Sequence, residues 1–474
     1  MKVKLLLSIM LIISAWGNVS AQKKNMFAPP KKGTMVKAQK IVTTEHGHKS
    51  IGILIPDRGM ADPHVWIENE MLYAMCGHDK TWEPVNTWIM DRWELWSTKD
   101  LVNWKYEYSI QPTDTYIGNL PNCWAGDLCE RDGKYYWFFS NRNLNSGVMV
   151  ADKITGPYRD LLGKPLLTPQ TAKTKPYDPE IFIENGEYYI VFGASTYFIS
   201  KLNKDMKSLK TKAEPITVLD EKGKHKPMGD KPAMFKRGEW YYLMSGNKYA
   251  MSKNLYGPYQ FKGSFGVGAH NSFFQWKGQW YYIHETTDTN FFFRGIGLQP
   301  LYFNEDGTMH IAKTHADHPG TGRDYNFSAS QMGWHVEQDG TTLHWNKKGY
   351  IEGQTTQKEA AISSASFVMS SLSYNNVLKF KLRNESNSNS VRITLASYDS
   401  ARFPWKDYPL KSDWKKHTSV EVKVKPNSKK WIEYTIDMNS FKEKKESLMQ
   451  IRIEPTFGAI EGKWAIDDII IKKQ

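Results

Sequence analysis

Five polar side chains recur at similar places in the chain, and together they could perform acid–base chemistry. They are Asp62, Asp127, Asp178, Asp230 and His270, which lie 11, 9, 11, 12 and 12 residues before Tyr73, Tyr136, Tyr189, Tyr242 and Tyr282. Carboxylates gathered in a cavity of low dielectric shift one another's pKa, so that one stays ionised while another holds a proton near neutrality. A single Asp of this kind is usually a turn former, but five in register favour a shared site.

Each of these residues opens the same local unit, which is a short apolar strand, a turn and an aromatic strand. The clearest copy is YDPEIFIENGEYYIVFG, residues 177–193, and the tyrosines of successive copies are 63, 53, 53 and 40 residues apart. Such recurrence is typical of a radial or stacked β repeat. Five copies predict an all-β fold with a five-bladed β-propeller, in which the first strand of each blade lies nearest the axis. The five polar residues should then face one central cavity.

The chain divides into four segments by pattern. Residues 1–21 have a Lys-containing start, an apolar run and a small-residue end, which predict a signal peptide and a periplasmic or secreted protein. Residues 22–48 are a basic leader, and 49–318 form the propeller, with blade one starting at about Ile51. After a boundary near residues 315–323, regularly spaced strands over 325–474 predict a β-sandwich, jelly-roll-like domain. This accessory domain is either carbohydrate-binding or purely structural, and the second interpretation is slightly favoured.

Composition excludes several classes of protein. Cys76, Cys123 and Cys129 make no disulfide framework and contain no CxxC, so they are expected to be buried side chains rather than metal ligands. Nothing after the signal segment has the apolar length of a membrane helix. The net charge of +13 and the 14% aromatic content suit an anionic surface or a polyanionic sugar. Export disfavours a nucleic-acid partner.

Several motifs in order resemble one enzyme family. ADPHVWIENEMLYAMCGHD, WAGDLCERDGKYYWFFS, YDPEIFIENGEYYIVFG and HNSFFQWKGQWYYIHE, within residues 50–310, look like glycoside hydrolase family 43, the five-bladed propeller β-xylosidases and α-L-arabinofuranosidases. The resemblance implies an inverting, exo-acting hydrolase that removes a terminal pentose from an oligosaccharide. By that likeness Asp62 is the general base, Asp178 orients the acid and raises its pKa, and His270 holds a water or a calcium ion; no other cofactor is expected.

One catalytic position departs from the family pattern. The family's general acid is a Glu before Gly-Pro, whereas this chain has Asp230 in GDKPAMFKRGEWYYL. An Asp side chain is one methylene shorter, and misplacing a catalytic group by about 1 Å can cost a hundredfold in rate. Asp230 is therefore either a repositioned acid or the sign of an altered reaction.

The predicted substrate-binding residues are Trp124, Asp127, Lys231, His270 and Arg294. Trp124, three residues before Asp127, is the best candidate for a wall that stacks on a sugar ring. Arg294 is either an anion ligand or the partner of a blade carboxylate. Cations flank the expected site and favour an anionic sugar over a merely solvated surface; they are Lys173, Lys175, Lys222, Lys224, His225, Lys226 and Lys231.

These features leave two alternatives to pentose hydrolysis. In the first, a Lys, His or Tyr removes the C5 proton of a terminal uronic acid, and the protein is a lyase that acts by elimination. In the second, the propeller binds sugar without catalysis, which requires that Asp230 cannot reach a leaving oxygen.

Overall fold

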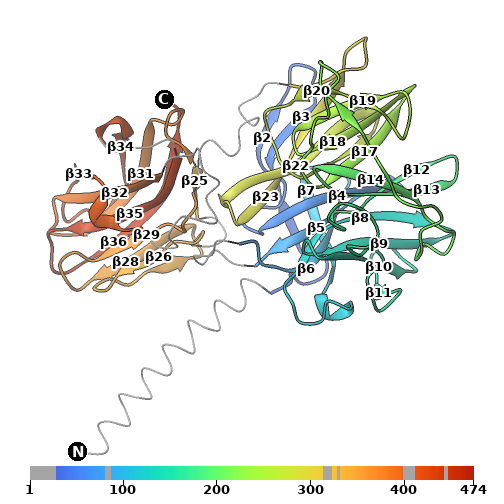
Figure 1. Ribbon diagram of the computed structural model, residues 1–474. Coiled ribbons are helices and arrows are strands. Elements are labelled where there is room, and N and C mark those ends of the chain that lie inside the picture. The colour runs from blue at the N-terminus through green and yellow to red at the C-terminus, as the bar shows by residue number, and fades with distance from the viewer. Residues whose placement is uncertain are drawn as a thin grey trace, which may run out of the picture.

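The computed structural model describes residues 28–80, 87–312, 323–327, 331–368, 370–398, 412–441 and 447–474 (Figure 1). These residues form β-strands joined by turns, with three short 3-10 helices at Pro112–Asp114, Trp414–Lys416 and Met438–Ser440 and no α-helix. No helix in the described ranges is long and apolar enough to cross a membrane. The predicted signal peptide, residues 1–21, lies outside the described residues. All three cysteines are free and buried, as expected.

Residues 35–311 form five sheets, each with its earliest hairpin at one edge. The first sheet is ordered β4 (Met60–Glu68), β5 (Met71–Asp79), β6 (Met90–Thr98), β7 (Asn103–Ile110) and β1 (Met35–Lys37). The second is ordered β8 (Cys123–Arg131), β9 (Lys134–Asn141), β10 (Asn145–Ala151) and β11 (Arg159–Asp160). The third is ordered β12 (Glu180–Glu184), β13 (Glu187–Ala194), β14 (Thr196–Lys201) and β15 (Glu214–Pro215).

The fourth and fifth sheets follow the same plan. The fourth is ordered β17 (Pro232–Arg237), β18 (Trp240–Ser245), β19 (Lys248–Ser252), β20 (Tyr259–Ser264) and β16 (Val218–Leu219). The fifth is ordered β21 (Asn271–Trp276), β22 (Gln279–Asn290), β23 (Phe293–Phe303), β3 (Lys49–Ile53) and β2 (Gln39–Thr43), with β24 (Met309–Ile311) also on β23.

The N-terminal strands belong to the first and the fifth sheets, which differs from the segment boundaries expected from the sequence. The strand around Ile51 does not start the first sheet, because β3 pairs with β23 in the fifth. Part of the predicted basic leader is also strand, since β1 pairs with β7 and β2 with β3. The chain is therefore closed on itself by backbone pairing between segments about 250 residues apart, which no local pattern could indicate.

The five first strands contact one another in cyclic order, β4 to β8, β12, β17, β21 and back to β4. Each first strand pairs with the next strand of its own sheet through a two-residue turn, for example Asn185-Gly186 with φ of 52° and 74°. Such left-handed pairs suit Asn-Gly, and their twist matches that of the flanking strands. The residues that face the centre of this ring therefore come from all five sheets.

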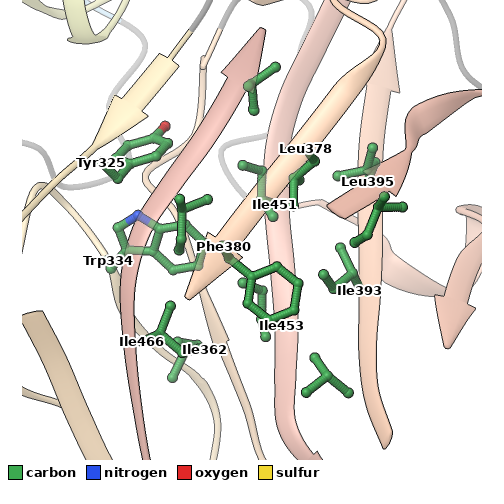
Figure 2. Close-up of a cluster of buried hydrophobic side chains, with 14 of the residues drawn as sticks. Tyr325, Trp334, Ile362, Leu378, Phe380, Ile393, Leu395, Ile451, Ile453 and Ile466 are labelled. Atoms are coloured by element: carbon green, nitrogen blue, oxygen red, sulfur yellow. The ribbon is translucent and has the colours of Figure 1, made fainter. Parts of the chain in front are cut away.

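The C-terminal part consists of two six-stranded sheets around one apolar core. In Figure 2, Leu378, Phe380 and Ile466 from one sheet lie among Ile393, Leu395, Ile451 and Ile453 from the other. The first sheet contains β25 (Arg323–Tyr325), β27 (His344–Asn346), β28 (Tyr350–Thr355), β31 (Val377–Ser386), β34 (Ile432–Asp437) and β36 (Gly462–Lys472). The second contains β26 (His335–Gln338), β29 (Ala361–Ser363), β30 (Ser370–Ser371), β32 (Ser390–Tyr398), β33 (Ser419–Lys423) and β35 (Ser447–Phe457).

Strand β3, which joins the N-terminal segment to the fifth sheet, is called here the closing strand. Its Ile51 lies opposite Ile41 of β2, and we expect replacement of the two residues to affect stability differently. Ile51 is fully buried, whereas its cross-strand partner Ile41 is 37% exposed. We expect Ile51→Ala to lower the free energy of unfolding by about 2–5 kcal/mol, because it leaves a cavity in the core. Ile41→Ala should cost less than about 1 kcal/mol. Urea unfolding followed by tryptophan fluorescence measures both, and equal losses would contradict a buried closing strand.

Candidate active site

The hairpin pairing fixes which residues are equivalent in the five sheets. The equivalent cross-strand pairs are Trp66–Tyr73, Cys129–Tyr136, Phe182–Tyr189, Phe235–Tyr242 and Phe274–Tyr281. Tyr281, rather than the predicted Tyr282, is therefore the equivalent residue of the fifth sheet. The residues eleven positions before these tyrosines, called here the first axial set, are Asp62, Ala125, Asp178, Lys231 and His270. Those nine positions before, the second axial set, are His64, Asp127, Glu180, Ala233 and Ser272.

Three members of the first axial set share an unusual backbone conformation. Asp62, Asp178 and Lys231 each precede a proline and have φ of 51°, 54° and 47°. Non-glycine residues adopt this left-handed region only where the surroundings hold them in it. Here each N–H donates to a side chain of another sheet: Asp62 to Glu285 Oε1 (2.9 Å), Asp178 to Ser140 Oγ (2.8 Å) and Lys231 to Asp178 Oδ2 (3.1 Å).

His270 lies between two of the predicted catalytic carboxylates. Its Nδ1 is hydrogen-bonded to Asp62 Oδ1, and its Nε2 lies 3.2 Å from Asp230 Oδ1. One ligand atom each of Asp178, Asp230 and His270 lie within 4.8 Å of one another. Asp62, Asp178, Asp230 and His270 therefore meet as the sequence predicted, although they come from four sheets.

The four groups differ in exposure, and this decides which can meet a substrate. Asp62 and Asp178 are 3% and 1% exposed, whereas the Asp230 side chain is 47% exposed. The Tyr177 hydroxyl donates to Asp230 Oδ2 at 3.2 Å. Asp230 thus presents an accessible carboxylate that is held from both sides, by Tyr177 and by His270.

The charge of His270 sets the protonation of its neighbours. Burial alone would lower the pKa of His270, but Glu285, Asp230 and Asp62 raise it well above its usual value. Burial would likewise raise the pKa of Asp62, yet the His270 charge lowers it to about 2. The pKa of Asp230 also lies below its usual value, because His270 outweighs the effect of burial. The imidazolium therefore stands between two carboxylates that both remain ionised.

Asp178 is the carboxyl group that holds a proton. Burial raises its pKa to about 8; His270 opposes this shift, and the charges of Asp230 and Asp62 reinforce it. The Ser140 hydroxyl lies 3.4 Å from Asp178 Oδ1, and the Lys231 N–H donates to Oδ2. Two ionised carboxylates and one protonated carboxyl thus lie around one imidazolium, which is a distribution suited to acid–base catalysis.

Arg294 has the second of the two roles considered from the sequence, because it pairs with carboxylates of the ring. Its guanidinium makes two bonds of 2.9 Å to Asp79, and Nη1 donates to Glu285 Oε1 at 2.8 Å. Direct binding of substrate by Arg294 stays a prediction, although the side chain is 9% exposed and its donors are bonded to Asp79 and Glu285. Burial raises the pKa of Glu285 to about 7, against the opposing charges of Arg294 and His270.

Asp127 and Lys231 are both buried, and their side chains lie against His64 and Glu180 of the second axial set. Asp127 is fully buried, pairs with His64 Nδ1 and accepts the Ile181 N–H. Lys231 is also fully buried, with Nζ 3.3 Å from Glu180 Oε2. Both were predicted to bind substrate, and this stays a prediction, although neither side chain is exposed in the structure.

Trp124 is half-buried, and its ring is already in contact with other groups. The Arg142 guanidinium lies 5.4 Å from the ring centroid, and Trp88 meets it edge-on at 6.3 Å. Its role as a sugar-stacking wall stays a prediction. Lys173, Lys175, Lys222, Lys224 and His225 are exposed and Lys226 is half-buried, as loop cations at a rim would be.

A calcium ion beside His270 also stays a prediction. Asp62, Glu285 and His270 offer one ligand atom each within 4.8 Å. Both ring nitrogens of His270 face carboxylates, and Glu285 is bonded to Arg294. A resident ion would have to displace these contacts, so the present donors do not fit one and no catalytic step is assigned to it.

Three residues of the site lie inside the sequence motifs but were not predicted to belong to it. Tyr177, next to Asp178, could have been noticed as a hydroxyl in the motif itself. Ser140 and Glu285 are the last residues of two of the quoted motifs and lie on β9 and β22, the second strands of their hairpins. Only the ring places second strands beside the first strands of the next sheet.

Comparisons with known proteins identify the family of the chain. A family model described as glycosyl hydrolases family 43 matches residues 57–309. The chain is 24% identical to a xylosidase/arabinosidase of Bacteroides ovatus, over 54% of this chain and 95% of that one. It is 26% identical to a β-xylosidase of Xylanibacter ruminicola, over 40% and 74%. Among solved structures, a family 43 enzyme from Xanthomonas citri in complex with xylotriose has 21% identity and a TM-score of 0.49, covering 58% of this chain and 96% of that one. Because the family model spans more than half of the sequence, the chain belongs to glycosyl hydrolases family 43.

Proposed function

We propose that the protein is an exo-acting, inverting glycosidase that removes a terminal pentose, xylose or arabinose, from an oligosaccharide. Membership of the family makes the chain a glycosidase. The relatives are named xylosidase/arabinosidase and β-xylosidase, and this supports a pentose. The observation that carries the proposal is the His270 imidazolium between ionised Asp62 and Asp230, with protonated Asp178 beside them.

In the proposed mechanism Asp62 is the base and Asp230 is the acid. Asp178 and His270 supply protons to Asp230. Asp62 accepts a proton from a water whose oxygen attacks the anomeric carbon, while the bond to the leaving oxygen breaks. The leaving oxygen takes a proton from Asp230, the exposed carboxyl group. Asp230 is ionised at rest, and Asp178 and His270, both within 4.8 Å, hold protons that can be passed to it. His270 keeps the base and the acid on opposite sides of one ring.

The wider architecture is part of the proposal. The cyclic contacts of the first strands support a five-bladed propeller, and the shared C-terminal core supports a β-sandwich accessory domain. The N-terminal pattern supports a signal peptide and a periplasmic or secreted protein. An anionic oligosaccharide as substrate is supported by exposed Lys173, Lys175, Lys222 and Lys224 on loops that lead to Asp178 and Asp230.

Elimination on a uronic acid is less well supported. It needs an unprotonated Lys, His or Tyr and a cation free to neutralise the sugar carboxylate. At the described site His270 is charged, burial raises the pKa of Tyr177, and Lys231 and Arg294 are paired with carboxylates. Incubation with pentose-capped and uronate-capped oligosaccharides tests this directly: free pentose supports hydrolysis, an ultraviolet-absorbing unsaturated uronate indicates elimination, and neither product indicates a binding protein.

Replacing the base should remove most of the activity. Asp62→Asn cannot accept the proton of water, and we expect kcat to fall by about 10²–10⁴-fold. The matched control is Asp132→Asn, in an exposed turn with the side chain 87% exposed, which should keep full activity. Initial rates of pentose release measure both variants. Retained turnover in Asp62→Asn would contradict the proposal.

Replacing the acid should make the rate depend strongly on the leaving group. Asp230→Asn cannot protonate the leaving oxygen, so we expect a loss of about 10²–10⁴-fold on a xylo-oligosaccharide. An aryl glycoside with an acidic phenol needs little protonation, and its hydrolysis should fall much less. Equal losses on the two substrates would show that Asp230 has another role.

The raised pKa of Asp178 predicts a pH dependence with a defined sign. We expect kcat/KM to fall as pH rises through about 8, since Asp178 then loses its proton. Its folded pKa exceeds the unfolded value of about 3.9, so its contribution to stability is complete below about pH 4 and is lost as pH rises to 8. Asp178→Asn should therefore show residual activity without this alkaline limb, and its Tm relative to wild type should rise from pH 4 to 8.

A further inference from the structure

Lys231 belongs to one axial set by sequence position and reaches into the other by its side chain. It stands in the first set, equivalent to Asp62 and Asp178, with the same positive φ. Its side chain is fully buried, and Nζ lies 3.3 Å from Glu180 Oε2 and 3.4 Å from the Pro232 carbonyl oxygen. An ammonium group is rarely buried so completely unless it compensates charge.

The second axial set around this ammonium has the donor atoms of a metal site. His64, Asp127 and Glu180 each offer one ligand atom, and these atoms lie within 4.8 Å of one another. An imidazole and two carboxylates suit a small first-row divalent cation such as Zn²⁺ or Mn²⁺. The His64 side chain is 11% exposed; its Nδ1 lies against Asp127 Oδ1, and its Nε2 has no hydrogen-bond partner among the described residues.

Sheet four makes room for the lysine. The first three sheets contribute His64, Asp127 and Glu180 to the second set, whereas the fourth contributes only the methyl group of Ala233. The four-carbon stem of Lys231 therefore extends from sheet four to Glu180. Asp127 and Glu180 are both buried, and without a cation their two carboxylates would repel each other.

We propose that His64, Asp127 and Glu180 form a divalent-cation site in which the Lys231 ammonium stands in place of the metal. The cluster connects β4, β8 and β12 to β17. Glu180 binds the ammonium of Lys231, the residue just before β17, and accepts the N–H of Met234 within β17 at 3.0 Å. The ammonium thus performs internally what a bound ion would do. This inference concerns the fold of the ring and goes beyond the proposed glycosidase activity.

The test exchanges the internal cation for an added one. Lys231→Met removes the charge and keeps most of the stem, and Lys231→Gly also relieves the positive φ. We expect either variant to bind one equivalent of Zn²⁺ in calorimetry, with Tm rising by roughly 5 °C or more at about 100 times the dissociation constant. Wild type should show neither effect. Ca²⁺, which prefers six to eight oxygen ligands, should bind the variants more weakly.

Matched controls locate the ion. Lys236→Met removes the lysine of an exposed pair on the same two strands, Lys236 with Glu184 at 2.5 Å, and should gain no zinc site. Glu180→Gln combined with Lys231→Met should abolish the gained site. If the single variants fold only when Zn²⁺ is present, the proposal is supported.

Three results would overturn the proposal. The first is that neither Lys231 variant gains a zinc site while folded. The second is that the variants fail to fold with and without Zn²⁺. The third is that wild type binds Zn²⁺ stoichiometrically and loses it in Glu180→Gln, since the ammonium would then not occupy the site.

Discussion

The charged imidazole of His270 is the interaction on which the rest of the site depends. It binds Asp62, 208 positions away in the sequence, and lies against Asp230, so it connects three sheets through one ring. Its charge favours the ionised form of both carboxylates, whereas burial raises the pKa of Asp178 against the His270 charge, so that Asp178 is the group that takes up a proton. The different protonation states of the three aspartates therefore follow from the burial of Asp178 together with the position of one cation.

The ring of first strands explains how strained residues persist at the centre. A non-glycine residue at positive φ costs of order 1–3 kcal/mol, and Asp62, Asp178 and Lys231 all have it. Each N–H donates to a side chain of the preceding sheet in ring order. The positive-φ conformation and the contact between the two sheets therefore stabilise each other. Glu285 in turn accepts a hydrogen bond from Arg294, and the guanidinium of Arg294 is itself bonded to Asp79. Closure of the ring and preparation of the site are thus the same set of hydrogen bonds.

Much of this was predictable from the sequence, because a hairpin repeat carries its own register. Asp62, Asp178, Asp230 and His270 were expected to meet, and they do. Counting from Tyr282 rather than Tyr281 shifted the fifth copy by one residue, since two adjacent tyrosines fit the pattern equally well. Asp127, nine residues before its tyrosine, was grouped with residues eleven or twelve before theirs, and this concealed the second axial set, so Lys231 was expected at the substrate rather than in a buried cluster. Glu285 and the closing strand β3 depend on contacts across the whole ring, which no local spacing encodes.

The shorter acid at position 230 can be understood from its neighbours. Asp230 lies one residue before the first axial set, whose own residue in this sheet is Lys231. The buried Lys231 side chain and its N–H bond to Asp178 fix the backbone on which Asp230 stands. The carboxylate is further held by Tyr177 and His270, at 3.2 Å each. A shorter side chain has fewer rotamers to restrict, so the loss of reach is accompanied by a smaller entropic cost of holding the acid in place. Under the proposed function, the leaving oxygen of a substrate would have to approach the backbone at position 230 more closely than it would if a glutamate stood there.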